Sequence, residues 1–253
     1  MPGDTQEHCY ERAVGLWRQS RFPIAFTGAG ISVASGIPDF RSPGGLWSKY
    51  DPMKVATAEA IQKNPKAVWE FLLETEDLLQ SCPPNSAHSA LATLEERHGL
   101  RGIITQNVDN LHQRAGSSEV VEYHGNFQRF YCQRCGKEED RDNVQHKARQ
   151  SIPPVCDDCD SYLRPDVVFF GEAIPFQAMQ RSQELIRNAD LILIAGTSGE
   201  VAPANTIPRE VKMKGGQVIE INKGRTYYRE LTDVRFDGPV EEILPKLLEY
   251  LDS

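Results

Sequence analysis

Four cysteines occur as two C-x2-C pairs, Cys132 with Cys135 and Cys156 with Cys159, separated by a gap of twenty residues. Two such pairs can close four thiolates tetrahedrally around Zn2+, and four cysteine ligands leave no open coordination position. The pattern therefore predicts one structural zinc ion per chain and places any chemistry elsewhere. Two disulfides in a secreted domain are the alternative, but residues 1–10 are acidic and polar and do not resemble a signal peptide.

Composition sets further limits on the class of protein. The chain has 253 residues, 40% of them hydrophobic, which is enough for one large α/β domain or two modest ones. The longest apolar runs, such as residues 191–195, are far shorter than the about 20 residues that a bilayer requires. A formal net charge of -8 disfavours direct binding to nucleic acid or anionic lipid and suits basic partners such as lysine-rich peptides. We expect a cytoplasmic protein without a membrane segment, and a monomer is compatible with the sequence.

Short β-type runs alternate with helical patterns along most of the chain. The predicted strands cover residues 24–27, 102–105, 120–123, 191–195 and 218–221, and the predicted helices cover 65–79, 86–97, 175–187 and 240–251. Near-continuous apolar strands separated by helices indicate a parallel sheet covered on both faces. The chain is therefore predicted to be an α/β protein with a doubly wound, Rossmann-like sheet, in which ligands bind beyond the carboxyl ends of the strands.

Two segments interrupt this alternation and predict a second, smaller lobe. The cysteine segment is rich in charge, contains Pro153 and Pro154, and has no pattern of a buried strand. The other interruption, from Pro43 to about Pro84, has a helical pattern. We predict one domain over 1–253, with a nucleotide-binding lobe at about 1–42, 86–125 and 166–253. The small lobe would comprise a helical part at about 43–85 and a zinc-binding part at about 126–165.

Glycines follow the first predicted strand, in the sequence Gly28-Ala29-Gly30-Ile31-Ser32. Glycines at this place let the backbone approach a pyrophosphate, whose charge then faces the amides at a helix N-terminus. The motif is weak alone, because Val33 replaces the third glycine of G-x-G-x-x-G and a tight turn is the alternative. Phe40 and Arg41 follow closely and add an aromatic ring and a cation beside the expected phosphate loop.

Polar residues follow the other predicted strands as well. They lie in residues 105–112, 122–126 and 196–198 and at Asn222. Because parallel strands end at the same edge of a sheet, these side chains should converge on one crevice. Turn formation and helix capping are the alternatives for the amides and for Asp109, and a packed or solvated imidazole is the alternative for His124.

Taken together and in this order, these segments resemble the sirtuin (Sir2-type) family of NAD-dependent protein deacylases, with a prokaryotic-like catalytic core. The matching segments are 28–32 with 36–41, 105–109, 124–125, the four cysteines, 169–172, 196–198 and 221–222, and they span nearly the whole chain. The resemblance implies an enzyme that consumes NAD and removes acyl groups, acetyl above all, from lysine side chains of proteins. Its products would be nicotinamide and O-acyl-ADP-ribose, with NAD and the acylated peptide meeting between the two lobes.

The resemblance also implies roles for individual residues. His124 would be the general base, and Asn107 would orient the nicotinamide ribose and catalytic waters. The NAD contacts implied are Gly28, Ala29, Gly30, Ser32, Phe40, Arg41, Gln106, Asn107, Val108, Asp109, Gly196, Thr197, Ser198 and Asn222. The strip that pairs with the substrate peptide would be Val167, Val168, Phe169, Phe170, Gly171 and Glu172.

Two other functions fit the same motifs: NAD-dependent mono-ADP-ribosylation of proteins, and a non-catalytic, NAD-sensing zinc scaffold. The preferred acyl group can be inferred from one departure from the family pattern. Relatives that favour succinyl- or malonyl-lysine carry a Tyr and an Arg three and six residues after a Trp, whereas this chain has Leu72 and Thr75 at those distances from Trp69. We therefore expect neutral acyl groups to be favoured over succinyl and malonyl groups.

Overall fold

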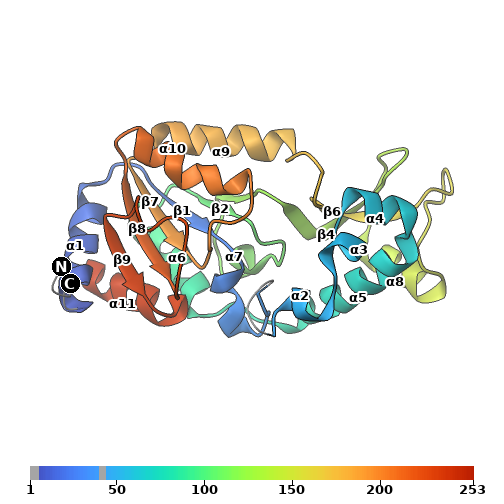
Figure 1. Cartoon of the computed structure of the whole chain (residues 1–253), viewed down its shortest axis with the longest axis horizontal. Helices are drawn as coiled ribbons and strands as arrows, with labels where there is room; N and C mark the ends of the chain where they lie inside the picture. Colours follow the sequence, from blue (N-terminus) through green and yellow to red (C-terminus); the bar gives the residue numbers. More distant parts are fainter. Residues whose placement is uncertain (1–5, 40–43) are drawn as a thin grey trace.

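The computed structural model describes residues 6–39 and 44–253, whose strands form two sheets (Figure 1). The large sheet has six parallel strands in the order β3-β2-β1-β7-β8-β9. These are β1 (Pro23–Thr27), β2 (Ile103–Thr105), β3 (Val120–Glu122), β7 (Leu191–Ala195), β8 (Gln217–Asn222) and β9 (Val234–Asp237). The chain builds outward from β1 in one direction and from β7 in the other, which confirms the doubly wound α/β fold.

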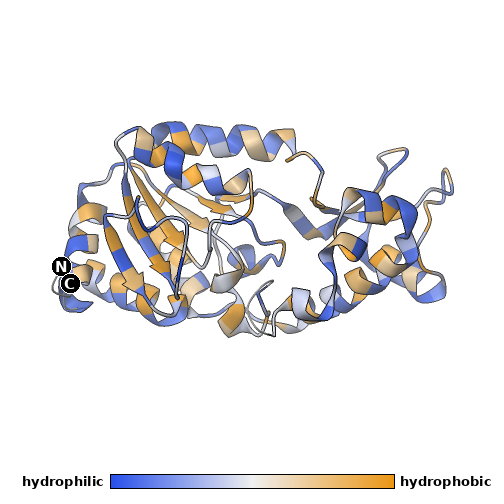
Figure 2. Cartoon of the chain, in the orientation of Figure 1, coloured by the Kyte–Doolittle hydropathy of each residue, from blue (hydrophilic) through white to orange (hydrophobic). Residues whose placement is uncertain are grey.

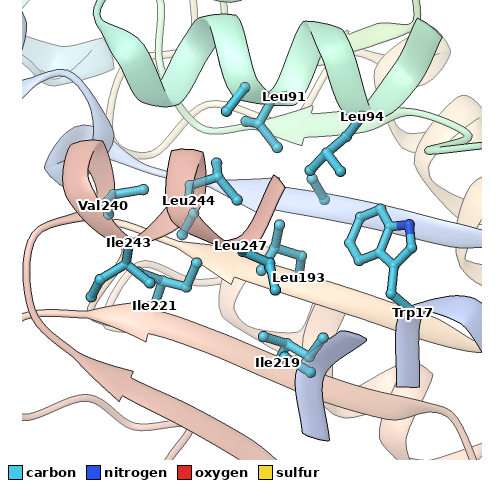
Figure 3. Close-up of a cluster of buried hydrophobic side chains, with 14 of the residues drawn as sticks. Trp17, Leu91, Leu94, Leu193, Ile219, Ile221, Val240, Ile243, Leu244 and Leu247 are labelled. Carbon is cyan, nitrogen blue, oxygen red and sulfur yellow. The ribbon is translucent and has the colours of Figure 1, made fainter. Parts of the chain in front are cut away.

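Helices cover both faces of this sheet (Figure 1). One face carries α1 (Gln6–Gln19), α6 (Ser86–Arg97) and α11 (Val240–Asp252), and the other carries α9 (Phe176–Asn188) and α10 (Ile207–Met213). Figure 3 shows Leu244 and Leu247 of α11 packed between α6 and the strands. Figure 2 shows the strands as the most hydrophobic part of this layer, in keeping with a sheet buried on both faces.

The predicted elements agree with the structure to within two residues at each end, but several others were missed, among them β9 and α1. Strand β9 has only Val234 and Phe236 buried, since it is a half-covered edge strand without a continuous apolar run. Helix α1 buries Tyr10, Val14 and Trp17, and their helical spacing was a signal that the sequence reading did not use.

The small sheet is antiparallel, with the order β5-β4-β6, and corrects the expectation that the cysteine segment lacks a buried strand. It consists of β4 (Gly125–Cys132), β5 (Glu138–Glu139) and β6 (Leu163–Val167). The pairing of β4 with β6 passes from Asn126 opposite Asp166 directly to Phe130 opposite Pro165, so residues 127–129 form a bulge. Pro165 has no N–H to donate to the ladder, and the extra residues of the bulge shift the alternation of side chains. The alternating pattern that would have revealed the strand is therefore interrupted.

The helical part of the second lobe packs against this small sheet. It contains α2 (Leu46–Lys49), α3 (Pro52–Val55), α4 (Ala58–Lys63) and α5 (Pro65–Ser81), and α8 (Arg141–Gln150) lies beside them. Trp69 of α5 is buried, stacks on Phe130 of β4 at 6.2 Å, and donates from Nε1 to the Leu163 carbonyl at 3.0 Å. The helical and cysteine-containing parts therefore share one hydrophobic core, while the exact lobe boundaries stay a prediction.

In the described parts of the chain, no helix is both long enough and apolar enough to cross a membrane. Phe40 and Arg41, which were predicted to contact NAD, lie outside the described residues.

Candidate functional site

The turn after β1 packs directly on the turn after β7. The Gly30 amide donates to the Gly196 carbonyl at 2.8 Å, and the Gly28 amide donates to the Ala195 carbonyl at 3.3 Å. A Cβ on Gly30 would lie 2.8 Å from the Gly196 backbone, and a Cβ on Gly196, which has φ +66°, would lie 2.3 Å from the Ile31 nitrogen. The glycines are therefore required for contact between two backbone turns, and not only for the approach of a phosphate.

The glycine loop, residues 28–32, continues into two 3-10 turns at Ala29–Ile31 and Val33–Ser35. The long helix whose N-terminus was expected to face a pyrophosphate does not follow it. Val33, at the place of the missing third glycine, is 49% exposed. The departure from the dinucleotide-binding fingerprint thus marks a real difference in backbone path.

Ser32 is the centre of a buried polar cluster that joins the glycine loop to the residues after β2. Its hydroxyl donates to Asp109 Oδ2 at 2.7 Å and accepts from Asn107 Nδ2 at 3.1 Å. Asn107 Nδ2 also reaches the Gly28 carbonyl at 3.2 Å, and Asp109 Oδ1 accepts from the Leu111 amide at 2.9 Å. Burial raises the pKa of Asp109, while the hydrogen bonds from Leu111 and Ser32 oppose that rise.

Two buried histidines lie behind this cluster: His112, which ends the predicted polar segment 105–112, and His88, which the sequence did not single out. His88 Nε2 is 3.5 Å from the Ser32 hydroxyl, and His112 Nε2 is 2.9 Å from Thr27 Oγ1. Their rings meet edge to face at 5.0 Å. Burial lowers the pKa of His88 to about 4 and that of His112 to about 3, so both imidazoles are neutral near pH 7. His112 Nδ1 finds no hydrogen-bond partner within the described chain.

Gln106 links the ends of three strands. Its Nε2 donates to Thr197 Oγ1 at 2.9 Å and to the Thr27 carbonyl at 3.3 Å. Its backbone carbonyl lies 3.1 Å from His124 Nδ1. The residues predicted after β1, β2, β3 and β7 therefore converge on one edge of the large sheet, as parallel strand ends should.

His124 lies between β3 and β4, where the chain passes from the large sheet to the small one. A carbonyl oxygen can only accept, so the bond to Gln106 places the imidazole proton on Nδ1 and leaves the Nε2 lone pair free in the neutral ring. Burial lowers the pKa of His124 below its ordinary 6.5, and the hydrogen bond to Gln106 acts in the opposite direction. The ring is therefore neutral near pH 7, with Nε2 able to accept a proton.

Asn222 ends β8 next to the Gly196 turn, since the Gly196 amide donates to the Ile221 carbonyl at 3.1 Å. Its Nδ2 donates to Glu220 Oε1 at 3.0 Å, and this carboxylate is fully buried and paired with Arg235 at 2.7 Å. The pair holds the Asn222 side chain in one orientation at the strand end. Glu220 was not predicted, because a single acid in an apolar strand gives no sign of its partners.

The predicted peptide strip, residues 167–172, is shaped by an arginine that sequence reasoning also missed. Arg164 is 5% exposed and donates to the Val167 carbonyl at 2.7 Å and to Glu172 Oε2 at 2.8 Å. The Glu172 carboxylate also accepts from the Phe169 amide at 2.9 Å, so the Glu172 side chain helps to hold the backbone of the strip. The backbone of Phe170 is already paired with the helical part of the small lobe: its amide donates to the Ala56 carbonyl and its carbonyl accepts from the Ala58 amide.

The four cysteines predicted to bind a metal lie together. Their Sγ atoms are all within 4.8 Å of one another, with Cys132 and Cys159 3.4 Å apart and Cys135 and Cys156 3.8 Å apart. A disulfide would need about 2.05 Å, whereas four sulfurs about 2.3 Å from a tetrahedral Zn2+ lie about 3.8 Å from one another. The donor set thus fits zinc and does not fit disulfides.

The two C-x2-C pairs end in turns of the same kind, and each turn brings the second cysteine of its pair back toward the first. Gly136 and Asp160 follow the second cysteines and have φ +72° and +57°. Their amides donate to the Cys132 and Cys156 carbonyls at 2.9 and 3.0 Å. An aspartate tolerates this left-handed conformation better than most residues, so Asp160 was a signal for the second turn.

Comparison with known proteins agrees with this geometry. The sequence model described as "Sir2 family" matches residues 28–203. The chain is 44% identical over 234 residues to "NAD-dependent protein deacylase 2" of Pyrobaculum aerophilum, covering 92% of each chain. It is 48% identical over 235 residues to the "NAD-dependent protein deacetylase" of Sulfurisphaera tokodaii, again covering 92% of each.

A solved structure of similar shape contains reaction products. It is a Sir2 protein with a deacetylated p53 peptide and 3'-O-acetyl ADP-ribose, and it matches with a TM-score of 0.90 at 37% identity. The match covers 94% of this chain and 97% of that one. The likeness therefore extends over both sheets and over the strand ends where the polar residues converge.

Proposed function

Because this chain belongs to the Sir2 family and is an NAD-dependent protein-lysine deacylase, we propose that His124 is the general base of its reaction. The observation that carries this proposal is the bond from His124 Nδ1 to the Gln106 carbonyl. It leaves the Nε2 lone pair free to accept a proton, and burial keeps the imidazole unprotonated near pH 7.

The reaction uses NAD as a co-substrate, whose ribose accepts the acyl group after nicotinamide leaves. In the proposed sequence, the acyl oxygen of the lysine amide captures the anomeric carbon as nicotinamide leaves. The base then takes a proton from a ribose hydroxyl, and the oxygen of that hydroxyl attacks the carbon of the former amide. Water finally releases free lysine and O-acyl-ADP-ribose. Positioning is the main task of the protein, because the acyl oxygen is a weak nucleophile.

The remaining residues receive roles that follow their places in the cluster. Asp109 and the backbone of Val108 would bind the nicotinamide carboxamide, and Gln106 and Asn107 would hold the adjoining ribose. The phosphates and the sugars next to them would bind Gly28, Ala29, Gly30, Ser32, Gly196, Thr197 and Ser198, and Asn222 would contact the adenosine ribose. The hydrogen bonds among Ser32, Asn107 and Asp109 support this proposal, since they fix these side chains before NAD arrives.

The substrate is an acylated lysine of a protein, and we propose that its backbone adds as a strand beside residues 167–172. Main-chain pairing of this kind gives affinity with loose sequence specificity. The solved relative contains a deacetylated p53 peptide, which supports a peptide as ligand.

Replacing His124 with alanine tests the assignment of the base. Deacylation should fall by about 100 to 10,000-fold, the usual contribution of a general base. Binding of NAD and the melting temperature should stay close to those of the unchanged protein. The measurement is kcat/KM on one acetylated peptide, and His146→Ala, at an exposed site on α8, is the matched control. Near-normal turnover by His124→Ala would exclude the assignment.

The pH dependence of activity provides a second test. The base must be neutral, so kcat/KM should be constant at high pH and fall as pH drops through the pKa of His124. Since burial lowers that pKa, the midpoint of the fall should lie below 6.5. His88 and His112 are buried neutral, so acid also destabilises the fold as their unfolded forms are protonated. Circular dichroism over the same range separates unfolding from loss of the base, and a midpoint above 6.5 would contradict the prediction.

We also propose that the four cysteines bind one structural zinc ion. Elemental analysis should find one zinc per chain, and Cys156→Ser should lower metal content, melting temperature and activity together. The loss of activity would be indirect, because the small lobe depends on the metal for its fold. Cys9→Ser, outside the cluster, is the control and should keep its zinc. A metal-free protein with full activity and unchanged stability would refute the proposal.

The acyl preference can be tested at the pocket predicted beside α5. Leu72 and Thr75 have uncharged side chains, so neither offers a cation to an acidic acyl group. Leu72 is buried, and Thr75 Oγ1 donates to the Phe71 carbonyl at 2.8 Å. Glu74 pairs with Lys49 and Glu76 pairs with Arg141 at 2.6 Å, which neutralises charges near the helix. The expected selectivity therefore rests on the lack of a guanidinium for a buried carboxylate.

We expect acetyl-lysine to be favoured over succinyl-lysine by at least about tenfold in kcat/KM, equivalent to about 1.4 kcal/mol. One peptide carrying acetyl, decanoyl or succinyl lysine provides the comparison. Thr75→Arg should raise the rate on the succinyl peptide relative to the acetyl peptide. Preference of the unchanged protein for the succinyl peptide would show that the pocket is assigned to the wrong residues.

A further inference from the structure

The segment that carries His124 is short and joins the two sheets. Strand β3 ends at Glu122 and β4 begins at Gly125, so Tyr123 and His124 form the whole crossing between them. Gly125 has φ +81°, and a Cβ there would lie 1.9 Å from the Asp166 carbonyl oxygen, so the backbone at the end of the crossing is in close contact with β6. The direction of the His124 imidazole therefore depends on how the two ends of this crossing are held.

Glu122 holds both ends. Its side chain is 15% exposed, and its Oε1 accepts from Gln113 Nε2 at 2.7 Å and from Asn126 Nδ2. Its Oε2 pairs with Arg129 Nη1 at 2.7 Å. The bond between Glu122 and Asn126 spans the crossing from one side to the other. Three donors, one of them charged, converge on a single carboxylate in a mostly buried place.

The bulge in β4 brings Arg129 to this carboxylate. The β4–β6 pairing skips residues 127–129, and Arg129 Nε donates to Asp166 Oδ2 at 2.8 Å. Asp166 directly precedes Val167, the first residue of the proposed peptide strip. The bulge also reaches the nicotinamide side of the site, because the Phe127 amide donates to the Val108 carbonyl at 3.2 Å. Glu122 thus connects the end of β3 with both segments beside His124.

We propose that Glu122 is a positioning residue of this deacylase, which acts by fixing the β3–β4 crossing and through it the direction of the His124 imidazole. The inference rests on the proposed role of His124 as base. Glu122 contacts neither NAD nor peptide in this scheme. Its carboxylate acts only through the hydrogen bonds to Gln113, Asn126 and Arg129.

Glu122→Gln changes these bonds while keeping the size of the side chain. The amide that replaces one oxygen is a donor and would face donors, so at least one partner loses its acceptor. The crossing should then shift, and a small displacement of a catalytic group costs up to about 100-fold in rate. The step that needs His124 should slow, whereas departure of nicotinamide, which precedes it, should not.

The test measures two steps on the same acetylated peptide: steady-state deacylation, and incorporation of labelled nicotinamide into NAD. For Glu122→Gln we expect kcat of deacylation to fall about 10- to 100-fold, with KM for NAD and the rate of nicotinamide exchange within about twofold of normal. Glu119→Gln is the matched control, since Glu119 lies three residues earlier and pairs with Arg181 at the surface. It should behave as the unchanged protein.

Arg129→Gln provides a second variant if Glu122→Gln does not fold, because the Arg129 side chain is 53% exposed. It should lower deacylation in the same selective way but less strongly, as the bonds from Gln113 and Asn126 remain. The proposal would be overturned if every variant that folds deacylates at the normal rate. It would also be overturned if deacylation and nicotinamide exchange fall equally.

His124→Ala in the same assays keeps the two proposals apart. If His124→Ala still deacylates, the assignment of the base is wrong, and the positioning role fails with it. If His124→Ala is inactive while Glu122→Gln matches Glu119→Gln, only the positioning role fails. Loss of deacylation with retained exchange in both His124→Ala and Glu122→Gln supports both proposals.

Discussion

The backbone of the glycine loop rests on the backbone of Gly196, at the ends of the two paired strands, β1 and β7, that join the two halves of the large sheet. Strands β1 and β7 are where the chain reverses its direction of building, so their turns meet at the edge where such folds bind ligands. Side chains on Gly30 or Gly196 would overlap backbone atoms, so the turns can approach only as glycines. The polar residues on neighbouring strand ends take their positions from this contact.

Buried hydrogen bonds then give the site a fixed shape before any ligand binds. Ser32 holds Asn107 and Asp109, Gln106 reaches Thr197, and Glu220 holds Asn222. Each bond saturates a buried polar group that would otherwise be costly, so the network stabilises one arrangement over its alternatives. The same arrangement suits a reaction in which a weak nucleophile must be held close to its target.

Local signals in the sequence predicted much of the fold and of the site. Strand β7 was predicted to the residue because its five residues are consecutive and apolar. Helix α6 was also predicted to the residue, and Asn85 caps its N-terminus. Elements stabilised by distant partners were missed. The bulge opposite Pro165 hid β4, and His88 becomes recognisable only when Ser32 lies beside it.

The sequence by itself determined the types of residue in the site, the alternation that makes a doubly wound sheet, and the cysteine spacing that fits a zinc ion. Those features depend on neighbours in the chain and on short, regular spacings. Only the tertiary structure decided which donors share a carboxylate and which nitrogen of His124 carries the proton. Glu122 and Arg129, or His124 and the Gln106 carbonyl, come together because two sheets meet at one crossing, and contacts between separate segments leave no local pattern in the sequence.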